Sequence, residues 1–516
     1  MDKKAVISVS DKIGIVEFAR GLNEQGFEII STGGTYKVLE KAGVSVKYVS
    51  EITGFPEILD GRVKTLHPKI HGGILAMDTK EHRAQCEKAG IEYIDLVCVN
   101  LYPFRETIAK PGVSFEEAIE NIDIGGPTMV RSAAKNHNRV TIVVNPEKYD
   151  EVLSSLRENN GTVSAALRKR LAAEAFAHTA EYDRLIAGYL EQCDCEEDFP
   201  KNLRIVASKV QDLRYGENPA QKAAFYVDPE AGKGTLAFGH QLQGKELSYN
   251  NWVDMDAAWE MACEFEDITC VIVKHTNPCG IALGSSLSEA YERALEADPV
   301  SAYGGIIAFN RVVDEAVTSL IKERFYEVII APEFSPKAKE ILSAKKNLRL
   351  FVVGRNEKCD NCRTSGWKIK TINGGFVVQD EDKGIAPISE WKVASQKQPK
   401  EDDLAELEFA WKVCKHVKSN AIVVTNKRQV LGVGAGQMNR VGSAKIAVEQ
   451  AGKKANGAYM ASDAFFPFAD SIEEAHKQGI KAIVEPGGSI RDQEVIEMAD
   501  KLGIVLMFTG RRHFKH

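Results

Sequence analysis

Two neighbouring basic residues, Lys274 and His275, follow the apolar segment ITCVIV and precede TNPCG. The apolar segment predicts a strand, and reactive groups of α/β proteins gather where strands end. Histidine can exchange a proton near neutral pH, and an adjacent lysine can stabilise developing negative charge. Neighbouring side chains of a strand point to opposite faces, so both can serve one substrate only if the chain turns here. We expect TNPCG to provide that turn.

The chemistry of this pair is expected to need no metal. The neighbouring sequence has no PCxxC and no nearby acidic residue of the kind that a zinc deaminase uses, which favours proton transfer without zinc. A zinc nucleoside deaminase is kept as a second enzyme hypothesis, and a nucleotide-sensing module without turnover as a non-enzymatic one. The pairs Cys193/Cys195 and Cys359/Cys362 lie far apart without a histidine pair, which is typical of surface thiols.

Two glycine-containing turns near the start of the chain predict a phosphate site. STGGT (31–35) lies between a predicted strand and a helix, where backbone N–H groups attract anions and hydroxyls can add donors. The alternative is an ordinary turn with a threonine N-cap. SDKIG (10–14) occupies the preceding strand–helix turn, and such turns open at the same edge of a parallel sheet. The second turn favours the phosphate site.

Three further motifs add polar groups at that predicted edge. RVKTLHPKIHGG (62–73) is strongly basic, NLYPF (100–104) follows a buried strand, and IDIGGPTMVRSAAKNH (122–137) runs from Asp123 to Lys135. A solvated basic loop and a solvent-facing lysine are the alternatives. The convergence of several polar groups on one edge favours a site.

The second half of the sequence has three more candidate motifs. DLRYGENPAQ places Arg214 beside Tyr215, and such a pair can grip a phosphate and stack on a heteroaromatic ring. GVGAGQ lacks G-x-G-x-x-G spacing, and AIVVTNKRQVLGVG predicts a hairpin, which disfavours nicotinamide binding and favours backbone contacts to a flat ligand. SDAFFPFAD holds two adjacent phenylalanines that cannot both point the same way, so one can line a pocket.

The elements that must position these residues predict an α/β fold. KAVISVS, GIVEFARGLNEQG, FEIISTGG, TYKVLEKAG and VSVKYVS read as βαβαβ, the pattern of a parallel sheet covered by helices. The segment 163–192 predicts one long helix. Polar, turn-rich stretches at 193–203 and 383–403 predict boundaries. We therefore expect domains 1–195, 203–385 and 386–516, the last two of which can share a fold without a readable repeat.

Composition excludes several classes of protein. With 516 residues, 44% hydrophobic and 27% charged, the chain is typical of a folded protein of several domains. A net charge of −7 gives no nucleic-acid signature, so an anionic ligand needs local basic groups. Neither a membrane-spanning apolar run nor a signal peptide is recognisable, which predicts a cytoplasmic protein.

Together the motifs resemble those of the bifunctional purine-biosynthesis family AICAR transformylase/IMP cyclohydrolase. SVSDK, STGGT, GRVKTLHP, NLYPF, IDIGG, AAKNH, RYGENP, KHTNPCG, GVGAGQ and SDAFFPF follow the family's order over nearly the whole chain. The resemblance implies formyl transfer from 10-formyltetrahydrofolate to AICAR, then dehydrative closure of formyl-AICAR to IMP. It also implies a methylglyoxal-synthase-like parallel-sheet domain, two cytidine-deaminase-like α/β subdomains without zinc, and a homodimer with the transformylase site at its interface.

The resemblance also implies roles for individual residues. His275 would be the general base and Lys274 would stabilise the transition state, whereas Lys135, helped by Tyr102 and Asp123, would exchange protons in the cyclohydrolase. The nucleotide of the cyclohydrolase would be bound by Lys12, Gly14, Ser31, Thr32, Gly33, Gly34, Arg62, Lys64, Thr65 and Asn100. AICAR would be bound by Arg214, Tyr215, Gly304, Glu327, Asn420, Phe465 and Arg512. The folate side would be formed by Arg440, Val441, Asp470, Ser489 and Ile490.

Three positions depart from the family's common residues. Ala220 stands where many relatives have histidine, Ile13 where threonine is common, and Glu327 where some have aspartate. The first change affects a secondary contact in the transformylase site. The second removes one hydroxyl near the expected phosphate but keeps the backbone N–H.

Overall fold

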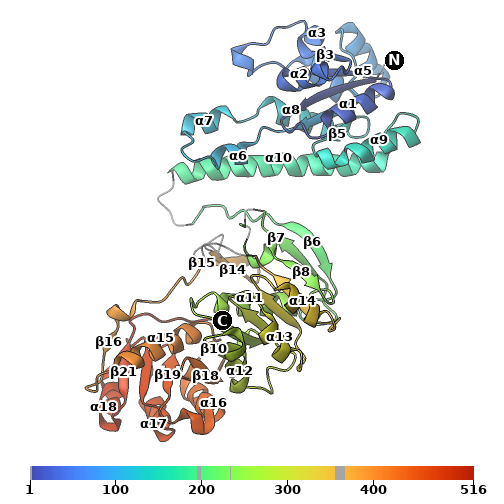
Figure 1. Cartoon of the computed structure of the whole chain (residues 1–516). Helices are drawn as coiled ribbons and strands as arrows, with labels where there is room; N and C mark the ends of the chain where they lie inside the picture. The colour runs from blue at the N-terminus through green and yellow to red at the C-terminus, as the bar shows by residue number, and fades with distance from the viewer. Residues whose placement is uncertain (1–2, 195–198, 230, 233, 355–366) are drawn as a thin grey trace. The chain divides into compact units, whose positions relative to one another are not determined.

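The computed structural model describes residues 3–194, 199–229, 231–232, 234–354 and 367–516, and it divides into two compact units, Met1–Arg204 and Ile205–His516 (Figure 1). The predicted boundary after residue 195 falls near this division. The predicted boundary between 385 and 386 falls inside the second unit, and both boundaries stay predictions. Two cysteine pairs are predicted to be surface thiols, Cys193/Cys195 and Cys359/Cys362. Their side chains are not among those that the structure describes.

The first unit is built on a parallel sheet of five strands in the order β3-β2-β1-β4-β5. These strands are β1 (Lys3–Val9), β2 (Phe27–Ser31), β3 (Val46–Tyr48), β4 (Leu96–Asn100) and β5 (Thr141–Val143). The predicted βαβαβ start is confirmed. Because β1 and β4 are central neighbours, the loops that follow them open side by side.

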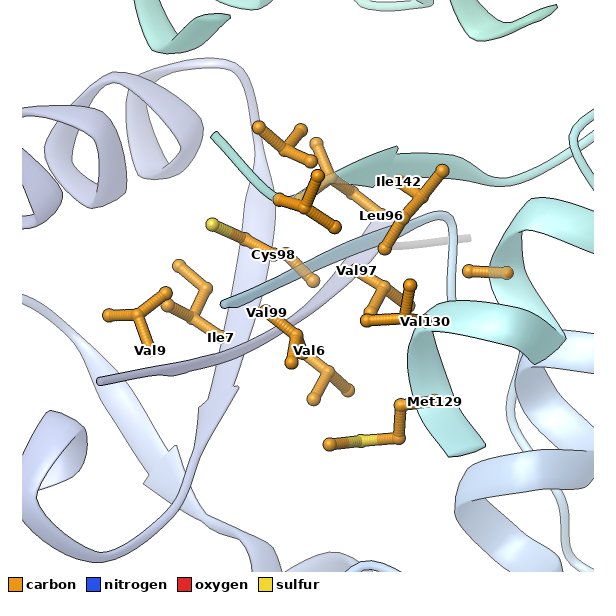
Figure 2. Close-up of a cluster of buried hydrophobic side chains, with 14 of the residues drawn as sticks. Val6, Ile7, Val9, Leu96, Val97, Cys98, Val99, Met129, Val130 and Ile142 are labelled. Carbon is orange, nitrogen blue, oxygen red and sulfur yellow. The ribbon is translucent and has the colours of Figure 1, made fainter. Parts of the chain in front are cut away.

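Helices cover this sheet, and the predicted long helix is confirmed as α10, which packs against α8 and β5. The helices are α1 (Ile15–Glu24), α2 (Gly33–Lys41), α3 (Val49–Thr53), α4 (Pro68–Leu75), α5 (Lys80–Lys88), α6 (Phe104–Ile108), α7 (Phe115–Glu120), α8 (Gly125–Lys135), α9 (Tyr149–Glu158) and α10 (Ala165–Asp194), with 3₁₀ turns at Leu59–Gly61 and Pro146–Lys148. Figure 2 shows Val6, Leu96 and Ile142 of the strands near Met129 and Val130 of α8. The strands are continuous apolar runs because helices bury both faces.

The second unit is organised around one sheet of twelve strands, in the order β16-β21-β20-β19-β17-β18-β10-β9-β11-β12-β13-β8. These strands are β8 (His240–Gln243), β9 (Thr269–Lys274), β10 (Asn277–Leu283), β11 (Ile306–Phe309), β12 (Val328–Ala331), β13 (Arg349–Val352), β16 (Lys392–Val393), β17 (Ile422–Asn426), β18 (Gln429–Gly434), β19 (Tyr459–Ser462), β20 (Ala482–Glu485) and β21 (Val505–Phe508). Two separate hairpins pair β6 (Ser208–Leu213) with β7 (Ala223–Val227) and β14 (Trp367–Ile372) with β15 (Gly375–Asp380).

The two halves of this large sheet repeat the same order of elements. Each half has a helix, an antiparallel hairpin, a second helix and three parallel strands separated by helices. The helices are α11 (Tyr249–Ala262), α12 (Leu287–Ala297), α13 (Glu315–Ile321) and α14 (Pro336–Leu342) in the first half, and α15 (Glu401–Lys415), α16 (Arg440–Ala451), α17 (Asp470–Lys477) and α18 (Asp492–Leu502) in the second. Short 3₁₀ turns lie at Leu236–Phe238, Ile388–Glu390 and Gly452–Ala455. The predicted hairpin around TNKRQ is β17–β18.

Close backbone packing in both halves depends on glycine. A Cβ on Gly280 of β10 would lie 1.9 Å from the carbonyl oxygen of Ala294, and a Cβ on Gly432 of β18 would lie 2.0 Å from that of Ala447. At these glycines each hairpin therefore approaches the backbone of the following helix closely. The halves join where β10 pairs antiparallel with β18, at Ala282 and Gln429.

A buried charged group links the ends of α11 and α15. Glu264 Oε2 lies 3.0 Å from Lys415 Nζ and 2.9 Å from His416 Nε2. Burial alone would raise the pKa of Glu264, but the hydrogen bond and charge of His416 and the charge of Lys415 lower it to about 2. Burial also lowers the pKa of His416. Glu264 is therefore the anionic centre of the group, with Lys415 as its cation.

Among the helices described, none combines the length and the hydropathy needed to cross a bilayer.

Candidate functional site

The ends of β1 and β4 are tied together at the edge where the phosphate site is predicted. Asn100 Oδ1 accepts hydrogen bonds from the backbone N–H groups of Ser10 and Asp11, at 2.5 and 2.9 Å. Asn100 therefore shapes the SDKIG loop, and its carboxamide oxygen is already used. Gly14, which precedes α1, has a φ of 67°, a conformation that glycine adopts without strain.

The hydroxyl groups of STGGT hold this loop against β1. Ser31 Oγ donates to Ile7 O at 2.7 Å, and Thr35 Oγ1 donates to Val9 O at 2.9 Å. Thr32 Oγ1 lies 2.9 Å from Ser8 Oγ. The hydroxyls predicted to meet a ligand are thus committed to the protein. The loop offers a ligand its backbone at Gly33 and Gly34, where α2 begins and an anion is favoured.

Lys12 also belongs to this loop structure. Its ammonium group donates to Val9 O, to Ser10 O at 3.3 Å and to Thr35 Oγ1 at 3.2 Å. Burial lowers the pKa of Lys12 despite the nearby charge of Asp11. Lys12 therefore places positive charge beneath the loop.

Lys64 brings the basic RVKT segment to the same place. Its Nζ lies 3.9 Å from the position that a Cβ on Gly33 would occupy, and 3.4 Å from Glu57 Oε1. The other carboxylate oxygen of Glu57 accepts from the Tyr48 hydroxyl at 2.7 Å. That hydrogen bond lowers the pKa of Glu57, with a further contribution from Lys64. The sequence alone did not identify Glu57 or Tyr48. The one available signal was that Glu57 precedes Lys64 by seven residues.

Thr65 and Asp123 meet at the start of α8. Thr65 Oγ1 lies 2.7 Å from where a Cβ on Gly125 would stand, and Asp123 Oδ1 accepts from Gly126 N–H at 2.8 Å. Burial raises the pKa of Asp123, while the N–H groups of Gly126 and Tyr102 and the charge of Lys64 oppose the rise. A half-buried carboxyl between a cation and a helix start is suited to proton transfer.

Three predicted residues of this unit lie farther out. Tyr102 is 46% exposed and lines a cavity of about 430 Å³ with Asn100 and Tyr182. Arg62 is exposed and forms an ion pair with Glu120. Lys135 is exposed at the far end of α8, about 15 Å along the helix from Gly125 at 1.5 Å per residue. Their assigned roles stay predictions.

In the second unit, the chain turns at Lys274 and His275, but earlier than predicted. His275 and Thr276 form a two-residue turn with φ of 53° and 63°, and Asn277 already belongs to β10. The expected turn at this pair is present, but of TNPCG only Thr276 belongs to it, and the assignment of the turn to the rest of that segment is wrong. The physical reason is Asp254 of α11, whose carboxylate accepts from Thr276 N–H at 2.7 Å and from His275 N–H at 3.3 Å. Asp254 had no recognisable sequence signal.

The turn presents His275 to a cavity of about 550 Å³. The His275 side chain is exposed and has no hydrogen bond to any described side chain or backbone group. Lys274 Nζ donates to Tyr303 O at 2.8 Å and lines the same cavity. Gly304 follows with a φ of 71°. A potential base and a cation thus face one space, with Asn277 and Asp298 in the wall.

Arg214 and Tyr215 line another cavity, of about 520 Å³, together with Glu327 and Arg349. The Arg214 guanidinium donates to the Tyr215 hydroxyl at 2.9 Å and lies 4.7 Å from its ring centre. Glu327 Oε2 accepts from the largely buried Arg349 at 2.6 Å. Arg349 was not anticipated. Backbone bonds from Gly304 N–H to Phe325 O and from Glu327 N–H to Gly305 O link this region to the Lys274 strand end.

Asn420 and Arg440 belong to a buried polar group. Arg440 donates to Asn420 Oδ1 at 2.7 Å, to Ser462 Oγ at 3.0 Å and to the carboxylate of Asp463, which is fully buried. Arg440 is 7% exposed, so in this structure its charge is neutralised inside the protein. Asn277 Oδ1 accepts from Lys418 N–H at 3.1 Å, which joins the start of β10 to the chain two residues before Asn420.

The remaining predicted residues lie on the surface of the second half. Phe465 is 37% exposed and Phe466 is fully buried, which confirms that the adjacent phenylalanines point different ways. The Arg512 guanidinium lies 4.7 Å from the ring centre of Phe514. The predicted folate-side residues are exposed or partly exposed apart from Arg440, and they are Val441, Asp470, Ser489 and Ile490. Their ligand contacts stay predictions.

Comparisons with known proteins agree along the whole chain. A family model described as AICARFT/IMPCHase bienzyme matches residues 133–450, and one described as MGS-like domain matches residues 14–128. A bifunctional purine biosynthesis protein PurH from Desulfitobacterium hafniense is 64% identical over 523 residues, covering 100% of both chains. The PurH of Bacillus mycoides is 55% identical over 517 residues, again covering 100% of both. A solved chain titled crystal structure of ForH is 38% identical and covers 37% of this chain and 100% of its own, with a TM-score of 0.34.

Proposed function

This chain belongs to the family of AICARFT/IMPCHase bienzymes, and from that premise we propose which residues carry its two reactions. It is a bifunctional enzyme of purine biosynthesis that transfers a formyl group to AICAR and closes the product to IMP. Its fold is an MGS-like parallel-sheet domain followed by the mixed α/β transformylase part. We assign cyclisation to the first unit and formyl transfer to the second, with 10-formyltetrahydrofolate as the formyl donor.

Formyl transfer is assigned to the cavity beside the His275 turn. The 5-amino group of AICAR attacks the formyl carbon, His275 removes the amine proton, and Lys274 stabilises the oxyanion that forms. The bond from the formyl carbon to the tetrahydrofolate nitrogen then breaks, and that nitrogen takes up a proton as tetrahydrofolate leaves. An aromatic amine is a poor nucleophile, so orientation and a base matter more than a covalent intermediate. The observation that carries this assignment is that the exposed His275 imidazole, which has no hydrogen-bond partner among the described residues, lines one cavity with Lys274.

AICAR binding is assigned to further residues of the second unit, which do not line the His275 cavity within one chain. The Arg214–Tyr215 pair is suited to hold a phosphate and stack on the heterocycle, and the cavity that it shares with Glu327 has nucleotide size. Phe465, with a partly exposed ring, and Arg512 add contacts. Gly304 follows Tyr303, whose carbonyl group binds Lys274, and the Asn420 side chain is held by Arg440. Val441, Asp470, Ser489 and Ile490 are assigned to the folate, and Arg440 to the support of Asn420.

We assign a homodimer to the enzyme. Arg214 and His275 line different cavities of one chain, which is the arrangement expected when a partner completes each site. The two separate hairpins also expose apolar side chains that a partner can cover. They are Val210, Tyr226, Ile372, Phe376 and Val377, each more than half exposed. Sedimentation equilibrium tests the assignment, and a monomer that is fully active at nanomolar concentration contradicts it.

Cyclisation is assigned to the edge formed by STGGT, Lys64, Thr65 and Asp123. The backbone at Gly33 and Gly34, with Lys12 beneath it, binds the phosphate, and Lys64 stabilises the oxyanion during ring closure. Lys135 is assigned as the proton donor and acceptor, helped by Tyr102 and Asp123. Arg62, Gly14 and Asn100 frame the pocket.

The experiment that tests both assignments is the conversion of AICAR and 10-formyltetrahydrofolate to IMP by the purified full chain. His275→Ala should abolish formyl transfer and spare cyclisation of pre-formed formyl-AICAR, whereas Lys135→Ala should do the reverse. If either substitution removes both activities from a folded chain, the two-site assignment fails. Zinc measured per active chain tests the expectation that no metal takes part. We place the enzyme in the cytoplasm, which fractionation of native cells checks.

A further inference from the structure

The repeated halves of the second unit each contain the same two-residue turn. Lys427 and Arg428 join β17 to β18 with φ of 52° and 54°, just as His275 and Thr276 join β9 to β10 with φ of 53° and 63°. Bulky residues rarely adopt these angles, and such turns favour Asn–Gly. Both halves therefore hold a two-residue turn of polar residues in the same left-handed backbone conformation.

A carboxylate from the preceding helix supports each turn in the same way. Glu406 of α15 accepts from Arg428 N–H at 2.9 Å, and Asp254 of α11 accepts from Thr276 N–H at 2.7 Å. Donor and acceptor are 22 residues apart in both cases. Burial raises the pKa of both carboxyl groups. The Lys427–Arg428 turn is thus the structural counterpart of the reactive turn.

The second turn also borders a cavity of comparable size. This cavity measures about 530 Å³, against about 550 Å³ beside His275. Each turn lies at the start of its second strand, β10 or β18. Because these two strands pair antiparallel, the two turns lie at opposite ends of the strands. The second cavity contains neither His275 nor Lys274, and it is lined by Ser285, Glu289, Arg293, Glu406, Lys427 and Arg428.

Charges in this cavity favour a ligand that is anionic at one end and donates hydrogen bonds at the other. The Lys427 and Arg428 side chains make no hydrogen bond or ion pair with any other described residue, whereas Arg293 is fixed by the carbonyl groups of Leu283 and Lys427. Asp267 adds an exposed carboxylate to the lining, which suits ribose hydroxyls or an exocyclic amine, whereas Glu289 already accepts hydrogen bonds from Ser285. The cavity has the size of small-molecule sites.

We infer that this cavity is a second ribotide site, in which Lys427 and Arg428 bind the phosphate of a nucleoside monophosphate. The positions of Lys274 and His275 are taken here by Asn426 and Lys427, so a base that titrates near neutral pH is missing from the turn. The site binds its ligand without turning it over. It is separate from both sites assigned above and does not depend on them.

The test is equilibrium dialysis of AMP against the full-length enzyme, counting AMP bound per chain at saturation. The decisive variant is Lys427→Asn/Arg428→Gly, which removes both cations and installs the residues that this turn prefers. Its melting temperature should equal or exceed that of the native chain, so misfolding cannot explain a loss. We expect the variant to bind one AMP fewer per chain, with affinity at this site reduced roughly 100-fold or more.

Lys322→Ala/Lys501→Ala is the matched control, because it removes two exposed cations that have no described partner elsewhere in the same unit. It should bind as many AMP molecules as the native chain. Equal AMP counts for the native chain and the Asn–Gly variant would overturn the inference, as would the same loss in the lysine control. Formyl transfer should be unchanged in the Asn–Gly variant. Failure of formyl transfer in the native chain would instead count against the proposed function and leave the AMP count unaffected.

Discussion

Asp254→Ala should disable formyl transfer without unfolding the enzyme. Asp254 fixes the reactive turn through bonds of 2.7 Å to Thr276 N–H and 3.3 Å to His275 N–H. A hydrogen bond to a charged acceptor contributes about 1.5–3 kcal/mol, and we count the longer bond at about 0.5 kcal/mol. The turn then loses about 2–3.5 kcal/mol of support. Each left-handed residue costs about 1 kcal/mol or more, so the unsupported turn relaxes.

The expected loss in kcat/KM for formyl transfer is about 30- to 300-fold, since 1.4 kcal/mol corresponds to a factor of ten. Asp254→Asn keeps an oxygen that can accept from Thr276 N–H, so its loss should be only about threefold. The assay follows formyl transfer from 10-formyltetrahydrofolate, with cyclisation of formyl-AICAR as the readout of the other unit.

Glu406→Ala is the matched control for Asp254→Ala, because it removes the corresponding carboxylate from the other turn. Formyl transfer by this variant should stay within about twofold of the native rate. A folded Asp254→Ala enzyme with the native rate of formyl transfer would refute the reasoning. Equal losses in the two variants would also refute it, because they would indicate general destabilisation of the sheet.

Three further predictions concern stability and binding. Glu264→Ala should lower the free energy of unfolding by about 3 kcal/mol in urea at pH 7, because two buried partners lose their anion. Since the folded pKa of Glu264 is about 2, below the unfolded value, this contribution is complete above about pH 4.5 and shrinks as the pH falls towards 2. Gly280→Ala should lower the free energy of unfolding by about 1–3 kcal/mol or more, because the added Cβ would lie 1.9 Å from a carbonyl oxygen. Gly188→Ala in α10, where a Cβ meets open space, should instead raise the melting temperature. Phe466→Ala should lower the free energy of unfolding by about 3–5 kcal/mol, because this ring is fully buried. Phe465→Ala should raise the KM for AICAR with little change in stability, because this ring is partly exposed. The reverse pattern would contradict the assigned orientation of the two rings.

The sequence predicted the elements better than it predicted the contacts between them. Alternating apolar segments and glycine turns identified the parallel sheet and the β17–β18 hairpin, because those signals are local. The His275 turn was misplaced because Asp254, on a different helix, determines where the chain bends. No local pattern identifies a carboxylate that acts 22 residues away.

The sequence identified the residues of the candidate site but not the hydrogen bonds that they make. Ser31 and Thr35 were expected to meet a ligand, yet their hydroxyls bind the backbone of β1. Arg440 was expected at the folate, yet its charge is neutralised by Asp463 in the interior. A residue's type shows what it can bind, but only the folded neighbourhood shows what it already binds. Tertiary hydrogen bonds such as these leave no periodic signal in the sequence.

The antiparallel junction between β10 and β18 has a consequence for synthesis on the ribosome. β10 ends at Leu283 and β18 begins at Gln429, so about 150 residues must be added before the partner strand exists. At roughly 5–20 residues per second, β10 stays an open edge strand for about 7–30 s. An unpaired edge is a template for pairing with other chains. The nascent enzyme therefore passes through a period of exposure to aggregation, and slow translation of the second half would lengthen it.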